Sequence, residues 1–72
     1  MTIEELRPNQ DATVVLHLRD GEIATVRIVY VDAEYGDIIV DVIQSNREYK
    51  RPEGSAYTIT ASEVVSVNSL SD

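Results

Sequence analysis

The sequence predicts an all-β domain: a small, five-stranded, strongly bent barrel preceded by a short N-terminal α-helix. Two observations lead to this prediction. Apolar and polar residues alternate with a period of two over much of the chain, which is typical of strands with one buried face. Turn residues interrupt the alternation at short intervals, which indicates short strands joined mostly by tight turns. With 72 residues and no internal repeat or linker, residues 1–72 are expected to form one domain.

A short helix is expected over residues 2–7. Thr2 can cap its first turn, and the glutamates that follow suit the positive end of the helix dipole. Pro8 disfavours helical backbone at the residue before it, so the helix should end there. Ile3 and Leu6 are three residues apart and give the helix one apolar edge to pack against the sheet.

The strands are expected at residues 12–19, 22–32, 37–44, 56–60 and 64–69. Asp20-Gly21 is a strong hairpin signal between the first two. The polar segment 45–55 is the longest loop. The second and third strands have apolar residues on both faces, which indicates that the helix or a neighbouring subunit covers the outward face.

The composition excludes several kinds of site. The chain has no cysteine and therefore no disulfide or thiol nucleophile, and His17 is its only histidine. We expect no metal and no cofactor. Thirteen acidic residues against six basic ones give a net charge of −7, which repels nucleic acid at long range. No signal peptide is visible and the apolar runs are too short to span a membrane, so a cytoplasmic location is expected.

Two groups of residues share their spacing with the motifs of a known family. The first is Val14, Leu16, Leu18, Gly21, Ile28, Val31, Asp32 and Asp37-Ile38-Ile39-Val40; the second is Ile59-Thr60-Ala61, Val64 and Val67. This pattern resembles the Sm and Sm-like (LSm) proteins and, with the leading helix, covers nearly the whole chain. The resemblance implies the bent barrel described above and assembly into a homo-oligomeric ring.

The resemblance also implies where single-stranded RNA would bind. In the family, an aromatic residue and an Asn before the third strand, with an Arg-Gly pair after the fourth, hold the bases. Here Tyr35 supplies the ring, whereas Asp37 replaces the Asn, and Thr60-Ala61 replaces Arg-Gly. The amide donor and the guanidinium are therefore lost. The resemblance therefore implies a divergent relative, in which the scaffold residues match the family better than the RNA-reading residues do.

In the family, rings form when the fourth strand of one subunit pairs with the fifth strand of the next. The resemblance implies that Ile39, Ile43, Tyr57 and Val65 contribute to this interface; the alternative is that they are ordinary residues of the barrel or lie beneath the helix. The expected function is a ring-forming binding or scaffold protein, with weak binding of single-stranded RNA as an added property. The alternative is a protein-interaction or structural subunit that binds no nucleic acid.

Arg47, Lys50 and Arg51 form the one basic cluster of the sequence. This cluster is either a phosphate-contacting loop tip or a solvated hairpin tip whose charge is offset by nearby glutamates.

Four carboxylates, Asp32, Glu34, Asp37 and Asp41, surround one turn and offer the oxygen ligands that Ca²⁺ or Mg²⁺ prefers. Their spacing does not fit an EF-hand, and Asp32 is instead expected to accept backbone N–H bonds within the turn. His17 should face outward from the first strand. No nucleophile elbow or glycine-rich phosphate loop is present, so we do not expect an enzyme.

Overall fold

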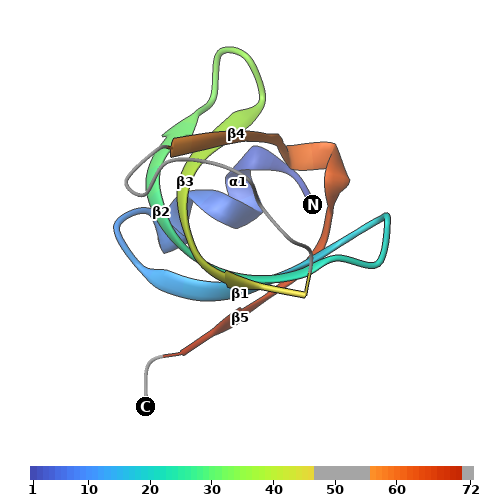
Figure 1. The fold of residues 1–72 in the computed structure, drawn as a ribbon. Helices are drawn as coiled ribbons and strands as arrows, with labels where there is room; N and C mark the ends of the chain where they lie inside the picture. Colours follow the sequence, from blue (N-terminus) through green and yellow to red (C-terminus); the bar gives the residue numbers. More distant parts are fainter. Residues whose placement is uncertain (47–55, 71–72) are drawn as a thin grey trace.

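The computed structural model describes residues 1–46 and 56–70. The chain starts with the short helix α1 (Ile3–Leu6), which continues into a 3-10 turn, η1 (Arg7–Asn9). Five strands follow: β1 (Thr13–Leu18), β2 (Ile23–Asp32), β3 (Asp37–Ser45), β4 (Ala56–Thr60) and β5 (Val64–Ser69), with the 3-10 turn η2 (Ala61–Glu63) between the last two (Figure 1). The prediction of a short helix followed by five antiparallel strands is confirmed, and this topology is consistent with the Sm-like one.

A capping box starts α1. The Thr2 hydroxyl accepts a hydrogen bond from the Glu5 N–H at 3.3 Å, and the Glu5 carboxylate accepts one from the Thr2 N–H at 3.0 Å. Hydrogen bonds to Thr2 lower the pKa of Glu5 below its ordinary value, and the bond with the Thr2 backbone has the larger effect. The helix ends at Leu6, and Pro8 lies in the 3-10 turn that follows. A four-residue helix gains little from its own hydrogen bonds, so its position depends on the packing of Leu6, with Met1 and Ile3, on the core.

The sheet has the strand order β4-β3-β2-β1-β5 and is open. β4 pairs with β3 and β5 pairs with β1, and within the described residues no ladder joins β4 to β5. The closed, strongly bent barrel that the sequence predicts is therefore not formed. The physical reason lies in η2, which carries the chain from one edge of the sheet to the other at a single corner (Figure 1). Beyond that corner the two edge strands have different partners.

The hydrophobic core lies on one face of the sheet and includes the helix. Val14 and Leu16 are fully buried, as their alternation predicts. Val26 is also fully buried. The buried core residues are Leu6, Val14, Leu16, Ala24, Val26, Ile28, Val31, Ile38, Val40, Ala61 and Val64. Because Leu6 belongs to this cluster, α1 packs on the inward face of the sheet, so of the two alternatives for covering the outward face, the helix is the wrong one.

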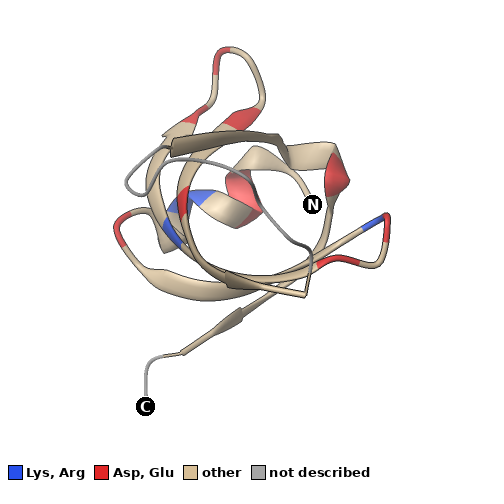
Figure 2. Ribbon diagram, in the orientation of Figure 1, with Lys and Arg blue, Asp and Glu red and all other residues tan. Residues whose placement is uncertain are grey.

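The turns follow local sequence chemistry. Gly21 has φ +93°, and its N–H donates to the Leu18 carbonyl at 3.0 Å, so the hairpin between β1 and β2 forms at the predicted Asp20-Gly21. The Asp20 carboxylate accepts a hydrogen bond from the Glu22 N–H at 2.9 Å. Acidic residues gather at this hairpin and at the turn between β2 and β3 (Figure 2). Within the described part of the chain, no helix is long and apolar enough to cross a bilayer.

Candidate functional site

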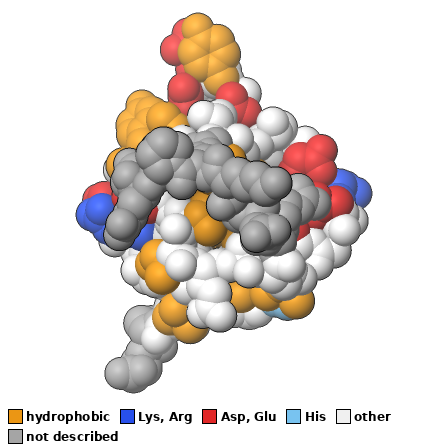
Figure 3. Space-filling model, in the orientation of Figure 1, with side chains coloured by type: hydrophobic (Ala, Val, Ile, Leu, Met, Phe, Trp, Pro, Cys, Tyr) orange, Lys and Arg blue, Asp and Glu red, His pale blue; other side chains and the backbone are white. Residues whose placement is uncertain are grey.

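The structure brings four of the residues implied in RNA binding together at one corner. Asp37 and Thr60 are directly opposite each other in the β3–β4 ladder. The Ala61 N–H donates to the Gly36 carbonyl at 2.9 Å, which joins η2 to the turn between β2 and β3. Tyr35 is at the tip of that turn with 74% of its surface exposed. A hydrophobic side chain projects from this turn among acidic ones in Figure 3.

The turn that presents Tyr35 is organised by a carboxylate. The Asp32 side chain accepts hydrogen bonds from the N–H groups of Glu34 and Tyr35, at 3.1 and 3.3 Å. The prediction that Asp32 ties down this turn is confirmed. With Glu34 and Asp37 beside it, the corner holds three carboxylates. The arrangement therefore offers an aromatic ring to a ligand but surrounds it with negative charge, which disfavours phosphates.

Arg47, Lys50 and Arg51 lie outside the described residues, so the structure says nothing of the predicted basic loop. In the part of the chain that is described, no three His, Cys, Asp or Glu side chains gather as a metal site. His17 lies on β1 opposite Ile23 of β2 and Ser66 of β5, on the face away from the core. His17 is therefore not part of a metal-binding group within the described residues.

The four residues that the resemblance assigns to a subunit interface are divided between two regions. Two of them are on β3, where Ile39 is half-buried and Ile43 is 61% exposed. Tyr57 on β4 packs against the core, and Val65 on β5 is 58% exposed. Tyr57 and Val65 therefore lie on the two edge strands, and the β3 residues lie on the neighbour of β4.

The backbone of β4 shows which of its residues face the open edge. In an antiparallel ladder, alternate residues direct both N–H and C=O toward the partner strand. The Ala61 N–H donates to Gly36, so the backbone groups of Ala61 face the β3 side. Ile59 and Tyr57, two and four residues earlier, therefore also direct their backbone groups toward β3. Thr58 and Thr60 consequently direct their backbone groups to the other side, which we call the outer edge of β4.

Backbone directions alternate along β5 in the same way. The Leu70 N–H donates to the Thr13 carbonyl at 3.4 Å, so Ser66 and Asn68 direct their backbone groups toward β1. Val67 directs its backbone groups away from β1, to the outer edge of β5. Its side chain packs on the core, whereas Asn68 is exposed. On the outer edge of β5, Val67 thus points its side chain inward, whereas on the outer edge of β4 Thr58 and Thr60 are exposed.

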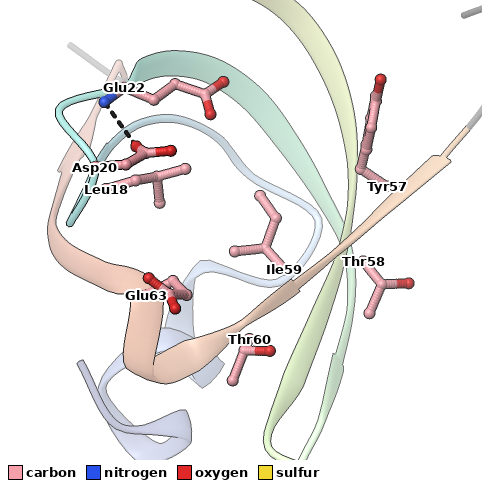
Figure 4. Close-up of a pocket in the computed structure, with 8 residues that line it drawn as sticks. All are labelled: Leu18, Asp20, Glu22, Tyr57, Thr58, Ile59, Thr60 and Glu63. Atoms are coloured by element: carbon pink, nitrogen blue, oxygen red, sulfur yellow. Dashed lines mark hydrogen bonds between the residues drawn. The ribbon is translucent and has the colours of Figure 1, made fainter.

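A cavity of about 540 Å³ lies between β4 and the hairpin that joins β1 to β2 (Figure 4). Ile59 points toward its middle, whereas Thr58 points away from the hairpin residues. The lining residues are Leu18, Asp20, Glu22, Tyr57, Thr58, Ile59, Thr60 and Glu63. Binding sites for small ligands have volumes of about 300–1,000 Å³, so the cavity has room for several side chains.

The wall of the cavity is negative on its hairpin side. Glu22 is 4% exposed and is the one buried charged side chain among the described residues. Its carboxylate accepts a hydrogen bond from the Ser45 hydroxyl at 2.7 Å. Asp20 and Glu63 contribute two further carboxylates. The cavity therefore favours hydrogen-bond donors or cations over anions.

Sequence reasoning did not single out the cavity. A signal existed directly before β2, because Glu22 continues the inward alternation of Ala24, Val26 and Ile28, all buried. A carboxylate in the inward register of a strand is rare enough to mark a site. Glu63 gave no comparable signal, since its position depends on how η2 turns the chain. No family model, curated protein or solved structure matches this chain.

Proposed function

We propose that this chain is a Sm-like scaffold protein that assembles into homo-oligomeric rings, with β4 of one copy pairing with β5 of the next. The observation that carries the proposal is the composition of the two edge strands. Neither β4 (AYTIT) nor β5 (VVSVNS) contains a charged residue or a proline. Proteins usually protect an exposed sheet edge with such residues, because unpaired backbone groups attract other strands.

The distribution of charge within the sheet supports this proposal. The charged residues of the sheet are on its central strands, such as Arg27 on β2 and Asp41 on β3, which already have partners on both sides. In a protein that works as a monomer, the opposite distribution is expected. Pairing between copies gives the outer-edge N–H and C=O groups of Thr58 and Thr60 partners other than water.

The acidic corner makes RNA a weaker candidate partner than a second copy of the chain. A base could stack on Tyr35, but the carboxylates of Asp32, Glu34 and Asp37 repel the adjoining phosphates. RNA binding is therefore proposed only as a weak added property. Fluorescence anisotropy with labelled oligo-U and oligo-A at low salt tests it separately, and absence of binding removes RNA without affecting the scaffold proposal.

Size-exclusion chromatography with light scattering tests the assembly, using two variants of Thr58. Thr58→Pro removes an N–H on the outer edge and leaves the β3 ladder intact, because proline is tolerated where the N–H faces away from the partner strand. Thr58→Val keeps that N–H and is the matched control. We expect Thr58→Pro to weaken assembly by at least about tenfold, or 1.4 kcal/mol, while Thr58→Val assembles like the wild type.

Two results would contradict the proposal. One is a wild-type chain that remains monomeric at concentrations of about 100 μM, where even weak specific oligomers form. The other is a Thr58→Pro variant that is folded by circular dichroism and assembles as strongly as the wild type. A stable complex with a different protein, formed by a chain that never self-associates, would favour the alternative of a structural subunit.

A further inference from the structure

We infer that the cavity beside β4 receives the outward face of β5 from the next copy in the assembly, with Ser66 and Asn68 of that copy entering it. The inference rests on the proposed function and goes beyond it, because it assigns an occupant to the cavity and a face to each strand. It is based on the direction of the backbone groups, the register of β4 against β5 of the next copy, and the chemistry of the side chains.

The first step follows from the parity of the two ladders. Residues that form a hydrogen-bonded antiparallel pair have their side chains on the same face of the sheet. We call the proposed pairing of β4 with β5 of the next copy the seam. In a hydrogen-bonded pair across the seam, Thr58 or Thr60 is opposite a β5 residue that, like Val67, directs its backbone groups away from β1. Thr58 points away from the core and Val67 points into it. An antiparallel seam therefore joins the inward face of one copy to the outward face of the next.

The consequence for the cavity concerns the remaining residues of each strand. Tyr57 and Ile59 line the cavity, and both are on the inward face of β4. Across the seam they share that face with Ser66 and Asn68, which are on the outward face of β5. Shifting the seam by two residues leaves this relation unchanged, because side chains alternate with a period of two.

The second step fixes the register. All five residues of β4 lie opposite residues of β5 when Thr58 is opposite Val67 of the next copy, and a shift of two residues in either direction places at least one β4 residue beyond the end of β5. This register matches the backbone directions of Thr58 and Val67. Val65 lies at the irregularity of the β1–β5 ladder between His17 and Leu18, so it does not define the register. The register places Asn68 opposite Tyr57 and Ser66 opposite Ile59.

The third step is chemical. The cavity wall holds the carboxylates of Asp20, Glu22 and Glu63, so a negatively charged strand would be repelled. β5 has no charged residue, and its outward side chains in this register are an amide and a hydroxyl, which can donate hydrogen bonds. In a chain with a net charge of −7, a neutral strand that donates hydrogen bonds is the segment that this cavity accepts most readily.

Charge substitutions on neighbouring residues of β5 test the inference by sedimentation velocity. Asn68→Asp is nearly isosteric and places a fourth carboxylate in the cavity, so assembly should weaken at least about tenfold. Asn68→Lys changes the sign of the charge and should assemble as tightly as the wild type or more tightly. Ser69→Asp adds the same charge on the other face of the seam and should stay within about threefold of the wild type.

Two results overturn the inference while leaving the proposed function intact. In the first, Asn68→Asp and Ser69→Asp weaken an existing oligomer equally, which means that net charge alone is responsible. In the second, Asn68→Lys weakens it as much as Asn68→Asp does, which means that the carboxylates are not near residue 68. A wild-type chain that never assembles overturns the proposed function, and this inference with it.

Cross-linking gives an independent measurement, since the chain has no cysteine of its own. Ile59→Cys combined with Ser66→Cys places thiols in directly opposed positions across the seam, where a disulfide can form. We expect this double variant to give disulfide-linked oligomers on mild oxidation. Ile59→Cys combined with Ser69→Cys has its thiols on opposite faces and should not, and equal cross-linking of the two variants contradicts the inferred faces.

Discussion

Leu6 is the fully buried residue of the N-terminal helix, and shortening its side chain should have a large effect. Its side chain is fully buried in the core cluster, although α1 has only four residues. Leu6→Ala removes three carbon atoms at roughly 0.8 kcal/mol each, or about 2.4 kcal/mol. The unfilled space adds to this, so the total loss should be about 3 kcal/mol.

That loss is large compared with the stability expected for a chain of this size. A domain of 72 residues has a free energy of unfolding of about 4–11 kcal/mol, at roughly 0.05–0.15 kcal/mol per residue. Leu6→Ala should therefore shift the urea midpoint strongly while leaving the slope of the transition unchanged. The measurement is urea unfolding followed by circular dichroism at one fixed protein concentration, because assembly would otherwise contribute to the apparent stability.

Leu70→Ala is the matched control, because the same atoms are removed from a side chain that is 51% exposed. Its loss should stay within about 0.5 kcal/mol, which is usual for surface substitutions. If Leu6→Ala costs less than about 1 kcal/mol, Leu6 is not part of a close-packed core. The helix would then be an attached segment rather than a structural element of the domain.

Two further predictions concern local structure. Because hydrogen bonds to Thr2 lower the pKa of Glu5 in the folded state, its contribution to stability is present above the unfolded pKa and is lost as pH falls through the folded pKa. The stability difference between wild type and Glu5→Gln in urea unfolding should therefore shrink on acidification from neutral pH; a constant difference would contradict the capping box. Gly21→Ala should cost about 1–2 kcal/mol from backbone conformation alone, since φ is +93° and no atom lies within 4 Å of an added Cβ. A cost no greater than that of a surface alanine substitution in the same assay would contradict this conformation.

The elements of the fold follow from local sequence chemistry, and their closure does not. Alternation places Val14 and Leu16 inward, and Asp20-Gly21 places the first hairpin, because both effects act over a few neighbouring residues. Whether β4 pairs with β5 depends on the direction that η2 gives to the chain, which is set by long-range packing. Alternation specifies the buried face of each strand and contains no information on which edges meet.

The candidate site was only partly predictable, because part of it depends on contacts between segments that are far apart in the sequence. The corner that joins Asp37 to Thr60 was implied by the family resemblance, and the ladder places these residues opposite each other. The cavity depends on the approach of β4 to a hairpin more than thirty residues earlier in the sequence. Only Glu22, with a carboxylate in an inward register, gave a local signal of it.

The charge of the chain distinguishes between the two partners that the resemblance suggests. Phosphate binding needs cations at the site of contact, and the corner around Tyr35 has carboxylates there instead. Strand pairing needs backbone groups and an absence of like charge along the edge, and both edge strands are neutral although the whole chain has a net charge of −7. The acidic residues are thus placed where they repel a polyanion and are absent from the strands at which a second copy would add. This placement is the reason to expect self-assembly rather than RNA binding from this chain.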